Sequence, residues 1–247
     1  MYLAMPEKTA AIVVIGNEIL TGKSQDKNAS FLIGELHQLG VSLKRIVVIP
    51  DEVDEIAATV RECSRKFDHV FTSGGIGPTH DDVTIEGVAR AFERKVIRHP
   101  ELEAMIRAYF GDEVNDSRLR MADVPEGSEL VRPEGMRWPV LAVSGVYILP
   151  GVPEFFRSKF EAMRELFRVE PFHLRAVYTL EDEFDIAPRL DRLALDHPDV
   201  EVGSYPNFAR EDYKVKITLE SKELPAVERA LEQLVAALSA SELVRTE

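Results

Sequence analysis

The sequence predicts an α/β fold with a mostly parallel sheet, followed by a small α+β unit of ferredoxin-like character. The first observation is a series of short continuous apolar runs, which are typical of strands covered on both faces. The second is that apolar stripes at helical spacing lie between these runs, so that helical crossovers join parallel strands. The third is a change near residue 170 to alternating apolar and polar residues, which indicates an antiparallel sheet.

In the first hundred residues each apolar run is followed by a polar loop or a helical stripe. Residues 10–15 form the first run, and a helix starting at Asn28 follows a polar loop at residues 16–27. Further strands are predicted at residues 43–49 and 69–72, and further helices at residues 56–67 and 84–92. Cys63 lies on the apolar stripe of residues 56–67, so we interpret it as a core residue.

The middle of the chain is less regular, because Pro and Gly residues interrupt residues 125–139. Helices are predicted at 102–110, at 116–121 and from Pro153 to about residue 168, and strands at 140–143 and 147–149. Pro153 is compatible with the first turn of its helix because the missing N–H would have no partner there.

We expect a domain boundary at Glu170-Pro171, with a large domain at residues 8–170 and a small one at residues 171–247. The small domain reads as strand, helix, two strands and helix. The strands are predicted at 174–180, 200–205 and 213–220, and the apolar stripes of the helices are at Ile186, Leu190 and Leu193 and at Val227, Leu231, Leu234 and Leu238.

Composition excludes several classes of function. The formal net charge is −13, which argues against binding nucleic acid or an anionic membrane through a broad basic surface. A single cysteine excludes an internal disulfide and metal sites built from several cysteines. Because the sequence has neither a long apolar span nor a signal-like stretch at residues 1–8, we expect a cytoplasmic protein.

A near match to a phosphate-binding P-loop lies at residues 16–24. The segment follows a strand and ends in Gly22-Lys23-Ser24, but five residues separate the first glycine from the Gly-Lys pair where the motif needs four. The extra residue would displace the amides that hold phosphate, so we reject a P-loop.

The strongest functional signal is the loop at residues 73–84. Gly74, Gly75 and Gly77 follow a strand and allow the backbone to approach a ligand closely, and the following helix points its positive end at the same place. Asp81 and Asp82 come next, and adjacent carboxylates beside a phosphate suit an ion such as Mg²⁺. The structural alternative is that the glycines shape a tight loop and one aspartate caps the helix.

A second loop, at residues 150–154, also follows a strand. It includes Gly151 and could form the opposite wall of the same site, although by itself it is only a turn that opens a helix.

Three segments together carry a family resemblance: residues 16–20 (Gly-Asn-Glu-Ile-Leu), residues 74–84 (Gly-Gly-Ile-Gly-Pro-Thr-His-Asp-Asp-Val-Thr) and residues 149–153 (Leu-Pro-Gly-Val-Pro). The chain resembles the MoaB/Mog-type molybdopterin-binding domain over about residues 8–168, in the branch found at the N-terminus of competence/damage-inducible protein A (CinA) and in FAD synthases. The tail is similar to the small second domain of CinA-like proteins. Residues 132–139, and the position of Glu154 directly after Pro153, look closer to the version linked to FAD synthase.

The resemblance implies a three-layer α/β/α sandwich and a ligand that contains phosphate, either a nucleotide or a pterin such as molybdopterin. By position, Gly74, Gly75, Gly77 and Thr79 would hold phosphate and Asp81 and Asp82 a divalent metal (Mg²⁺, Mn²⁺ or Co²⁺). Gly151 would contribute the second wall, and Glu18 would face the site from the first strand-end loop.

Three activities follow from this resemblance. The first is metal-dependent hydrolysis of a nucleotide pyrophosphate such as ADP-ribose or FAD, the second is binding without catalysis, and the third is adenylylation of molybdopterin. By analogy we also expect a homo-oligomer.

Overall fold

The computed structural model describes residues 7–209 and 212–247 and divides the chain into two compact units. One unit ends at Val169 and the other starts at Glu170, and each is described here by itself. Residues 1–6, which carry most of the expectation that there is no secretory signal, lie outside the described residues. Across the described part of the chain, no helix is both long enough and apolar enough to cross a membrane.

The N-terminal unit is built on a six-stranded sheet in the order β2-β1-β3-β8-β7-β6. The four strands from β2 to β8 run parallel, and β7 and β6 are added antiparallel at one edge, so the predicted mostly parallel sheet is confirmed. The strands are β1 (Thr9–Ile15), β2 (Ser42–Ile49), β3 (His69–Ser73), β6 (Glu129–Val131), β7 (Val140–Val143) and β8 (Val146–Leu149).

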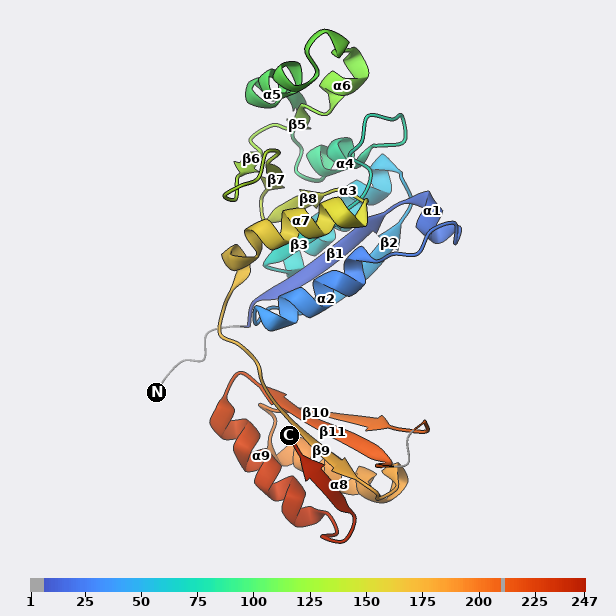
Figure 1. The fold of residues 1–247 in the computed structure, drawn as a ribbon, viewed down its shortest axis with the longest axis vertical. Coiled ribbons are helices and arrows are strands. Elements are labelled where there is room, and N and C mark those ends of the chain that lie inside the picture. The colour runs from blue at the N-terminus through green and yellow to red at the C-terminus, as the bar shows by residue number, and fades with distance from the viewer. Residues whose placement is uncertain (1–6, 210–211) are drawn as a thin grey trace. The chain divides into compact units, whose positions relative to one another are not determined.

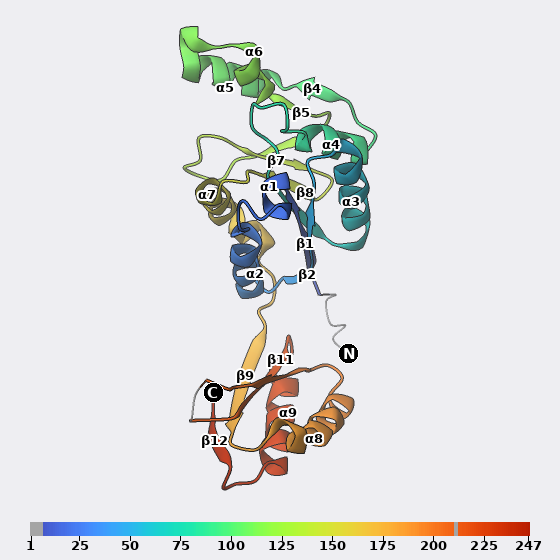
Figure 2. The ribbon, with the colours of Figure 1, turned by 90° about the vertical axis from the view of Figure 1, so that its right-hand side faces the viewer.

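Helices cover both faces of this sheet, as Figures 1 and 2 show. α2 (Asn28–Gln38) and α7 (Pro153–Met163) lie on one face, and α3 (Val53–Lys66) and α4 (Thr84–Ala91) on the other. Strand β1, which is apolar from Ala10 to Ile15, packs against both helical layers, because alternate side chains enter two separate hydrophobic clusters. Cys63 is buried in the second cluster, as predicted. These layers confirm the three-layer sandwich.

The middle segment adds a small cluster of its own at one end of this unit. It contains β4 (Val96–Arg98), α5 (Pro100–Phe110), a 3₁₀ turn (Gly111–Glu113), α6 (Asp116–Arg120) and β5 (Asp123–Pro125). Buried side chains of α5, α6 and β5 form its core.

The structure corrects several local predictions. The loop predicted at residues 16–27 contains a short helix, α1 (Asn17–Leu20), and the helix predicted to reach about residue 168 ends at Met163 and continues as a 3₁₀ turn (Arg164–Phe167). Strands β4, β5 and β6 were not predicted. Each of them is three residues long, which is too short to display a hydrophobic period.

The C-terminal unit is a four-stranded antiparallel sheet in the order β10-β11-β9-β12 with two helices, the ferredoxin-like pattern expected from the sequence. Side chains of β11 alternate between buried and half-buried, because one face packs on the helices. The last strand, β12, was not predicted. The elements are β9 (His173–Thr179), α8 (Glu183–Asp196), β10 (Glu201–Pro206), β11 (Val215–Ser221), α9 (Leu224–Ala237) and β12 (Leu243–Thr246).

Candidate functional site

Three loops meet at the carboxyl edge of the parallel strands. Strands β1, β3 and β8 are neighbours and run parallel, so the loops that follow them leave the sheet at the same edge. The Gly74 N–H donates to the carbonyl of Leu149 at 3.1 Å, and a Cβ on Gly74 would lie 2.2 Å from the carbonyl oxygen of Ile15. Gly74 is therefore the point where the three strand ends come together.

A buried threonine, Thr84, fixes the conformation of the turn at Gly74 and Gly75 by hydrogen bonds. Both glycines have positive φ, 107° and 64°, which is a backbone conformation that other residues rarely adopt. The Thr84 hydroxyl donates to the Gly74 carbonyl at 2.8 Å, and the Thr84 N–H donates to the Gly75 carbonyl at 3.0 Å. These two bonds fix the glycine turn to the first residue of α4.

The second half of the loop closes on Asp82. Its Oδ2 accepts hydrogen bonds from the Thr79 N–H at 2.8 Å and from the Thr79 hydroxyl, and a Cβ on Gly77 would lie 2.6 Å from the same oxygen. Val83 rather than an aspartate occupies the N-cap position of α4, so the alternative that an aspartate caps this helix is wrong. Asp82 instead stabilises the turn that contains Gly77 and Thr79.

Asp81 faces solvent. Its side chain is 63% exposed, and Nδ1 of the almost fully exposed His80 ring lies 4.0 Å from its Oδ1. The neighbouring Thr79 hydroxyl group and the Asp81 backbone N–H lower the pKa of the Asp81 carboxyl. The side chain is therefore ionised at neutral pH, as a ligand for a cation must be.

The loop offers a divalent metal two adjacent carboxylates, Asp81 and Asp82. Within residues 7–209 and 212–247, no three His, Cys, Asp or Glu side chains are grouped so that they could hold one. Mg²⁺, however, is commonly held by one or two carboxylates together with the phosphates of the substrate. Asp81 and Asp82 therefore form no resident metal centre, and an ion there would need further ligands from a bound phosphate.

A pocket of about 100 Å³ lies beside the glycine turn. Of the predicted site residues, Glu18 and Gly151 line it, and among the described residues those at 74–82 do not. The structure therefore separates the predicted residues into two neighbouring groups, a pocket and a loop. They are joined at Gly151, where a Cβ would lie 3.2 Å from the Cα of Gly74.

Asn28, which sequence reasoning used only as a helix start, connects the pocket to the loop. Its side chain is 97% buried, since only 3% of the residue is exposed, and its Nδ2 donates at 2.8 Å to both the Ser73 hydroxyl and the Gly151 carbonyl. Its spacing offered a signal, because Asn28 lies four residues before Leu32 and eight before Leu36 on the buried face of α2. A polar residue on that face requires partners.

Comparison with known proteins agrees with this architecture. Residues 11–168 match the family model described as "probable molybdopterin binding domain", and residues 171–247 match "FAD synthase, middle domain". The crystal structure of CinA, of unknown function, from Thermoplasma acidophilum superposes with a TM-score of 0.60 at 34% identity, covering 65% of this chain and 98% of that one.

Two sequence relatives cover most of the chain. A probable FAD synthase from Caenorhabditis briggsae is 36% identical over 92% of this chain and 50% of its own length. A protein from Archaeoglobus fulgidus is 38% identical over 79% of this chain and 84% of its own length. The chain thus spans about half the length of the curated FAD synthases that it matches.

Proposed function

The chain belongs to the family of probable molybdopterin binding domains, and from this premise we propose that its N-terminal unit binds a phosphate-containing nucleotide or pterin at the carboxyl edge of the six-stranded sheet. The observation that carries the proposal is the glycine turn that Thr84 fixes at the start of α4. Positive-φ glycines followed by a helix N-terminus orient backbone N–H groups toward an anion. The resemblance to FAD synthases favours a nucleotide among such ligands.

The reaction we propose is hydrolysis of a nucleotide pyrophosphate such as ADP-ribose or FAD. The N–H groups of residues 75–77 would hold the pyrophosphate and stabilise the negative charge that develops as its P–O bond breaks, because the Gly74 and Thr79 N–H groups already donate to Leu149 and Asp82 and Pro78 has none. Asp81 and Asp82 would hold a divalent ion (Mg²⁺, Mn²⁺ or Co²⁺), which when bound neutralises phosphate charge and lowers the pKa of a water. For Asp82 this requires an oxygen beyond the one that Thr79 occupies, and a carboxylate has two.

A second candidate function is binding without catalysis. It is favoured by the hydrogen bonds from Thr79 to Asp82, which give that carboxylate a structural role of its own. On this proposal the loop binds the ligand, and the exposed Asp81 contributes nothing beyond solubility.

The two candidates are separated by assaying hydrolysis of ADP-ribose and FAD with Mg²⁺, Mn²⁺ and Co²⁺. We expect turnover by the wild-type chain that falls at least about a hundredfold in Asp81→Asn, in which the amide keeps the shape of the side chain but removes its charge. Glu86→Gln, an exposed change on α4, is the matched control and retains turnover. Unchanged turnover in both Asp81→Asn and Asp82→Asn would end the metal-ligand proposal, and binding with no product would favour the second candidate.

A further inference from the structure

We infer that the pocket beside Asn28 takes the hydroxyl-bearing sugar portion of the ligand, either a ribose ring or a ribityl chain. This inference rests on the proposed function, because it assigns one part of the same ligand. The phosphates belong to the glycine loop, and the sugar belongs to the pocket lined by Glu18, Asn28 and Gly151.

The side chain of Asn28 carries a buried acceptor, Oδ1, that lacks a donor among the described residues. The two N–H bonds of the Asn28 amide are used by Ser73 and Gly151, which fixes Oδ1 as the remaining polar atom of the side chain. Among the described residues, no group donates to Asn28 Oδ1, although the atom is buried. A buried acceptor without a donor is costly, so a ligand that supplies an O–H or N–H gains more than it would at an exposed site.

The second argument is the charge of the pocket lining. Two carboxylates, Glu18 and Asp26, and one lysine, Lys27, line the same pocket. Both oxygens of Asp26 already accept from the first N–H groups of α2, at 3.2 and 3.0 Å, so the positive end of this helix is occupied. A lining with more carboxylates than cations disfavours phosphate, because like charges repel. It suits hydroxyl groups, since a carboxylate commonly binds the hydroxyls of a ribose.

The volume of the pocket also suits a sugar. The pocket measures about 100 Å³, whereas sites that enclose a whole drug-sized ligand measure roughly 300–1,000 Å³. It therefore accommodates one fragment of a nucleotide, such as a sugar, and leaves the ring system outside.

Access to Asn28 requires a small movement of the neighbouring loop. Oδ1 has almost no exposed surface in this structure, whereas residues 21–25 are all exposed and two of them, Ser24 and Gln25, line the pocket. Gly22 in this loop has positive φ, and a Cβ there would meet no other atom within 4 Å, so the loop is not packed against the rest of the unit at this residue. An outward displacement of Ser24 and Gln25 would widen the pocket that Asn28 lines, and this is the movement the inference requires.

The experiment compares ligand pairs that differ in their hydroxyl groups, with binding measured by calorimetry. One pair is AMP and 2′,3′-dideoxy-AMP, which tests a ribose, and the other is riboflavin and lumiflavin, which tests a ribityl chain. We expect wild-type chain to bind the hydroxylated member of at least one pair about tenfold or more tightly than its partner. Asn28→Ala should abolish this preference by weakening only the hydroxylated member.

Gln38→Ala, which truncates an exposed amide side chain at the other end of α2, is the matched control and keeps the preference. If Asn28→Ala does not fold, Glu18→Gln replaces it and should reduce the preference, because an amide oxygen is a weaker acceptor than a carboxylate. Equal binding of both members by the wild-type chain, or a preference that both substitutions leave unchanged, overturns the inference.

The outcomes also distinguish the inference from the proposed function. If AMP and 2′,3′-dideoxy-AMP bind equally well, phosphate binding at the glycine loop stands and the sugar pocket falls. If AMP, ADP-ribose, FAD and both flavins all fail to bind, the proposed function itself is wrong, and the sugar pocket falls with it.

Discussion

Gly74 lies where the ends of β1, β3 and β8 meet, and the space there has no room for a side chain. In Gly74→Ala, a Cβ would lie 2.2 Å from the Ile15 carbonyl oxygen, at a φ of 107° that alanine rarely adopts. We expect the free energy of unfolding to fall by about 3 kcal/mol, and ligand binding at the turn to be lost. Chemical denaturation measures the first effect and calorimetry the second.

Gly34→Ala provides the matched control for this substitution. Gly34 is an exposed residue of α2, and a Cβ there would meet nothing within 4 Å. Because alanine is a better helix former than glycine, the control should stabilise the chain by up to about 1 kcal/mol. Equal effects of the two substitutions would contradict the role given to Gly74.

Lys159 gives the N-terminal unit a specific pH dependence. Its Nζ donates to the carbonyls of Trp138 and Pro139, both at 3.0 Å, and burial lowers its pKa from 10.5 to about 8. The unfolded chain therefore binds more protons than the folded chain between these two pH values. The contribution of this group to stability consequently rises as the pH rises from about 8 toward 10.5.

Lys159→Met isolates this contribution, because methionine fills similar space without a charge. Between pH 7 and pH 10, the wild-type chain should gain stability relative to Lys159→Met by on the order of 2 kcal/mol. Denaturant titrations at the two pH values measure this difference. A difference that stays constant or changes in the opposite direction would show that Lys159 is not charged and buried as described.

At the residue scale, the sequence predicted the glycine turn but not its partners. Three glycines after an apolar strand have few structural explanations, so Gly74 and Gly75 were recognisable. Asp82 does not cap α4, and its role as a metal ligand stays a prediction. Its hydrogen bonds from Thr79 were not predicted, because they depend on the loop conformation. Asn28 was missed as a site residue because its partners, Ser73 and Gly151, are 45 and 123 residues away in the chain.

At the element scale, long apolar runs and stripes were predictable and short elements were not. Strand β1 and helix α3 carry their own periodicity and were found close to their observed bounds. All three residues of strand β4 are exposed, so it shows no alternation, and α1 is a single turn of four residues. Tertiary contacts and not local pattern therefore determine both elements.

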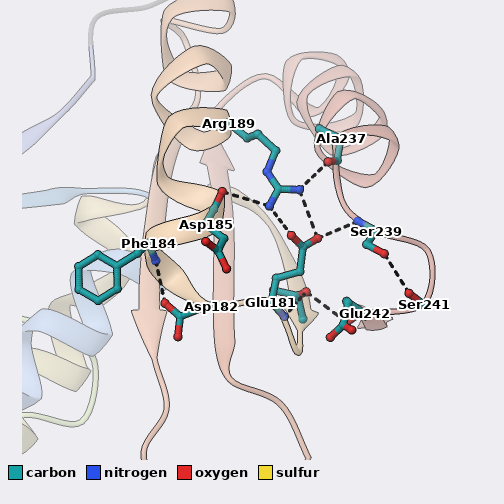
Figure 3. Close-up of polar contacts among 10 residues, drawn as sticks. Glu181, Asp182, Phe184, Asp185, Arg189, Ala237, Ser239, Ser241 and Glu242 are labelled. Atoms are coloured by element: carbon teal, nitrogen blue, oxygen red, sulfur yellow. Dashed lines mark hydrogen bonds and ion pairs between the residues drawn. The ribbon is translucent and has the colours of Figure 1, made fainter.

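A clasp in the C-terminal unit joins the end of β9 to both helices, as Figure 3 shows. Glu181 pairs with Arg189 of α8, Arg189 donates to the Ala237 carbonyl at the end of α9 at 2.8 Å, and Glu181 accepts from the Ser239 N–H at 2.7 Å. The Glu181 side chain is only 12% exposed and that of Arg189 29%, so the pair is shielded from solvent more than a surface pair.

Removing the cation of this clasp should destabilise the unit. In Arg189→Met we expect a loss of about 1–3 kcal/mol, because Glu181 and the Ala237 carbonyl both lose a charged donor. Arg192→Met removes a more exposed ion pair with Asp196 on the same helix and should change stability by less than about 0.5 kcal/mol. Thermal unfolding of the two variants decides the prediction, and equal losses would contradict it.

The same clasp has a defined response to acid. Hydrogen bonding to Arg189 lowers the pKa of Glu181 below its ordinary value, so the folded state favours the ionised carboxylate. The stabilisation is therefore present at pH values above the ordinary pKa of a glutamate and is lost as the pH falls through the lowered value. Below that pH, the wild-type chain and Arg189→Met should converge in stability.

At the scale of the whole molecule, each unit has a hydrophobic cluster of its own. The core of the C-terminal unit is formed by residues between Val177 and Leu243. A fragment of residues 170–247 should therefore fold alone and unfold cooperatively in denaturant, with a circular dichroism spectrum of mixed helix and strand. A fragment without a cooperative transition would show that this unit depends on the rest of the chain.

The central claim is that the glycine turn after β3 binds the phosphates of a nucleotide or pterin. The most direct measurement is a crystal structure of the full chain with ADP-ribose and Mn²⁺, in which anomalous scattering locates the metal. We predict phosphate oxygens within hydrogen-bonding distance of backbone N–H groups at residues 75–77 and Mn²⁺ beside Asp81 and Asp82. Phosphate density at another surface, with the turn at Gly74 and Gly75 empty at saturating ligand, would contradict this account.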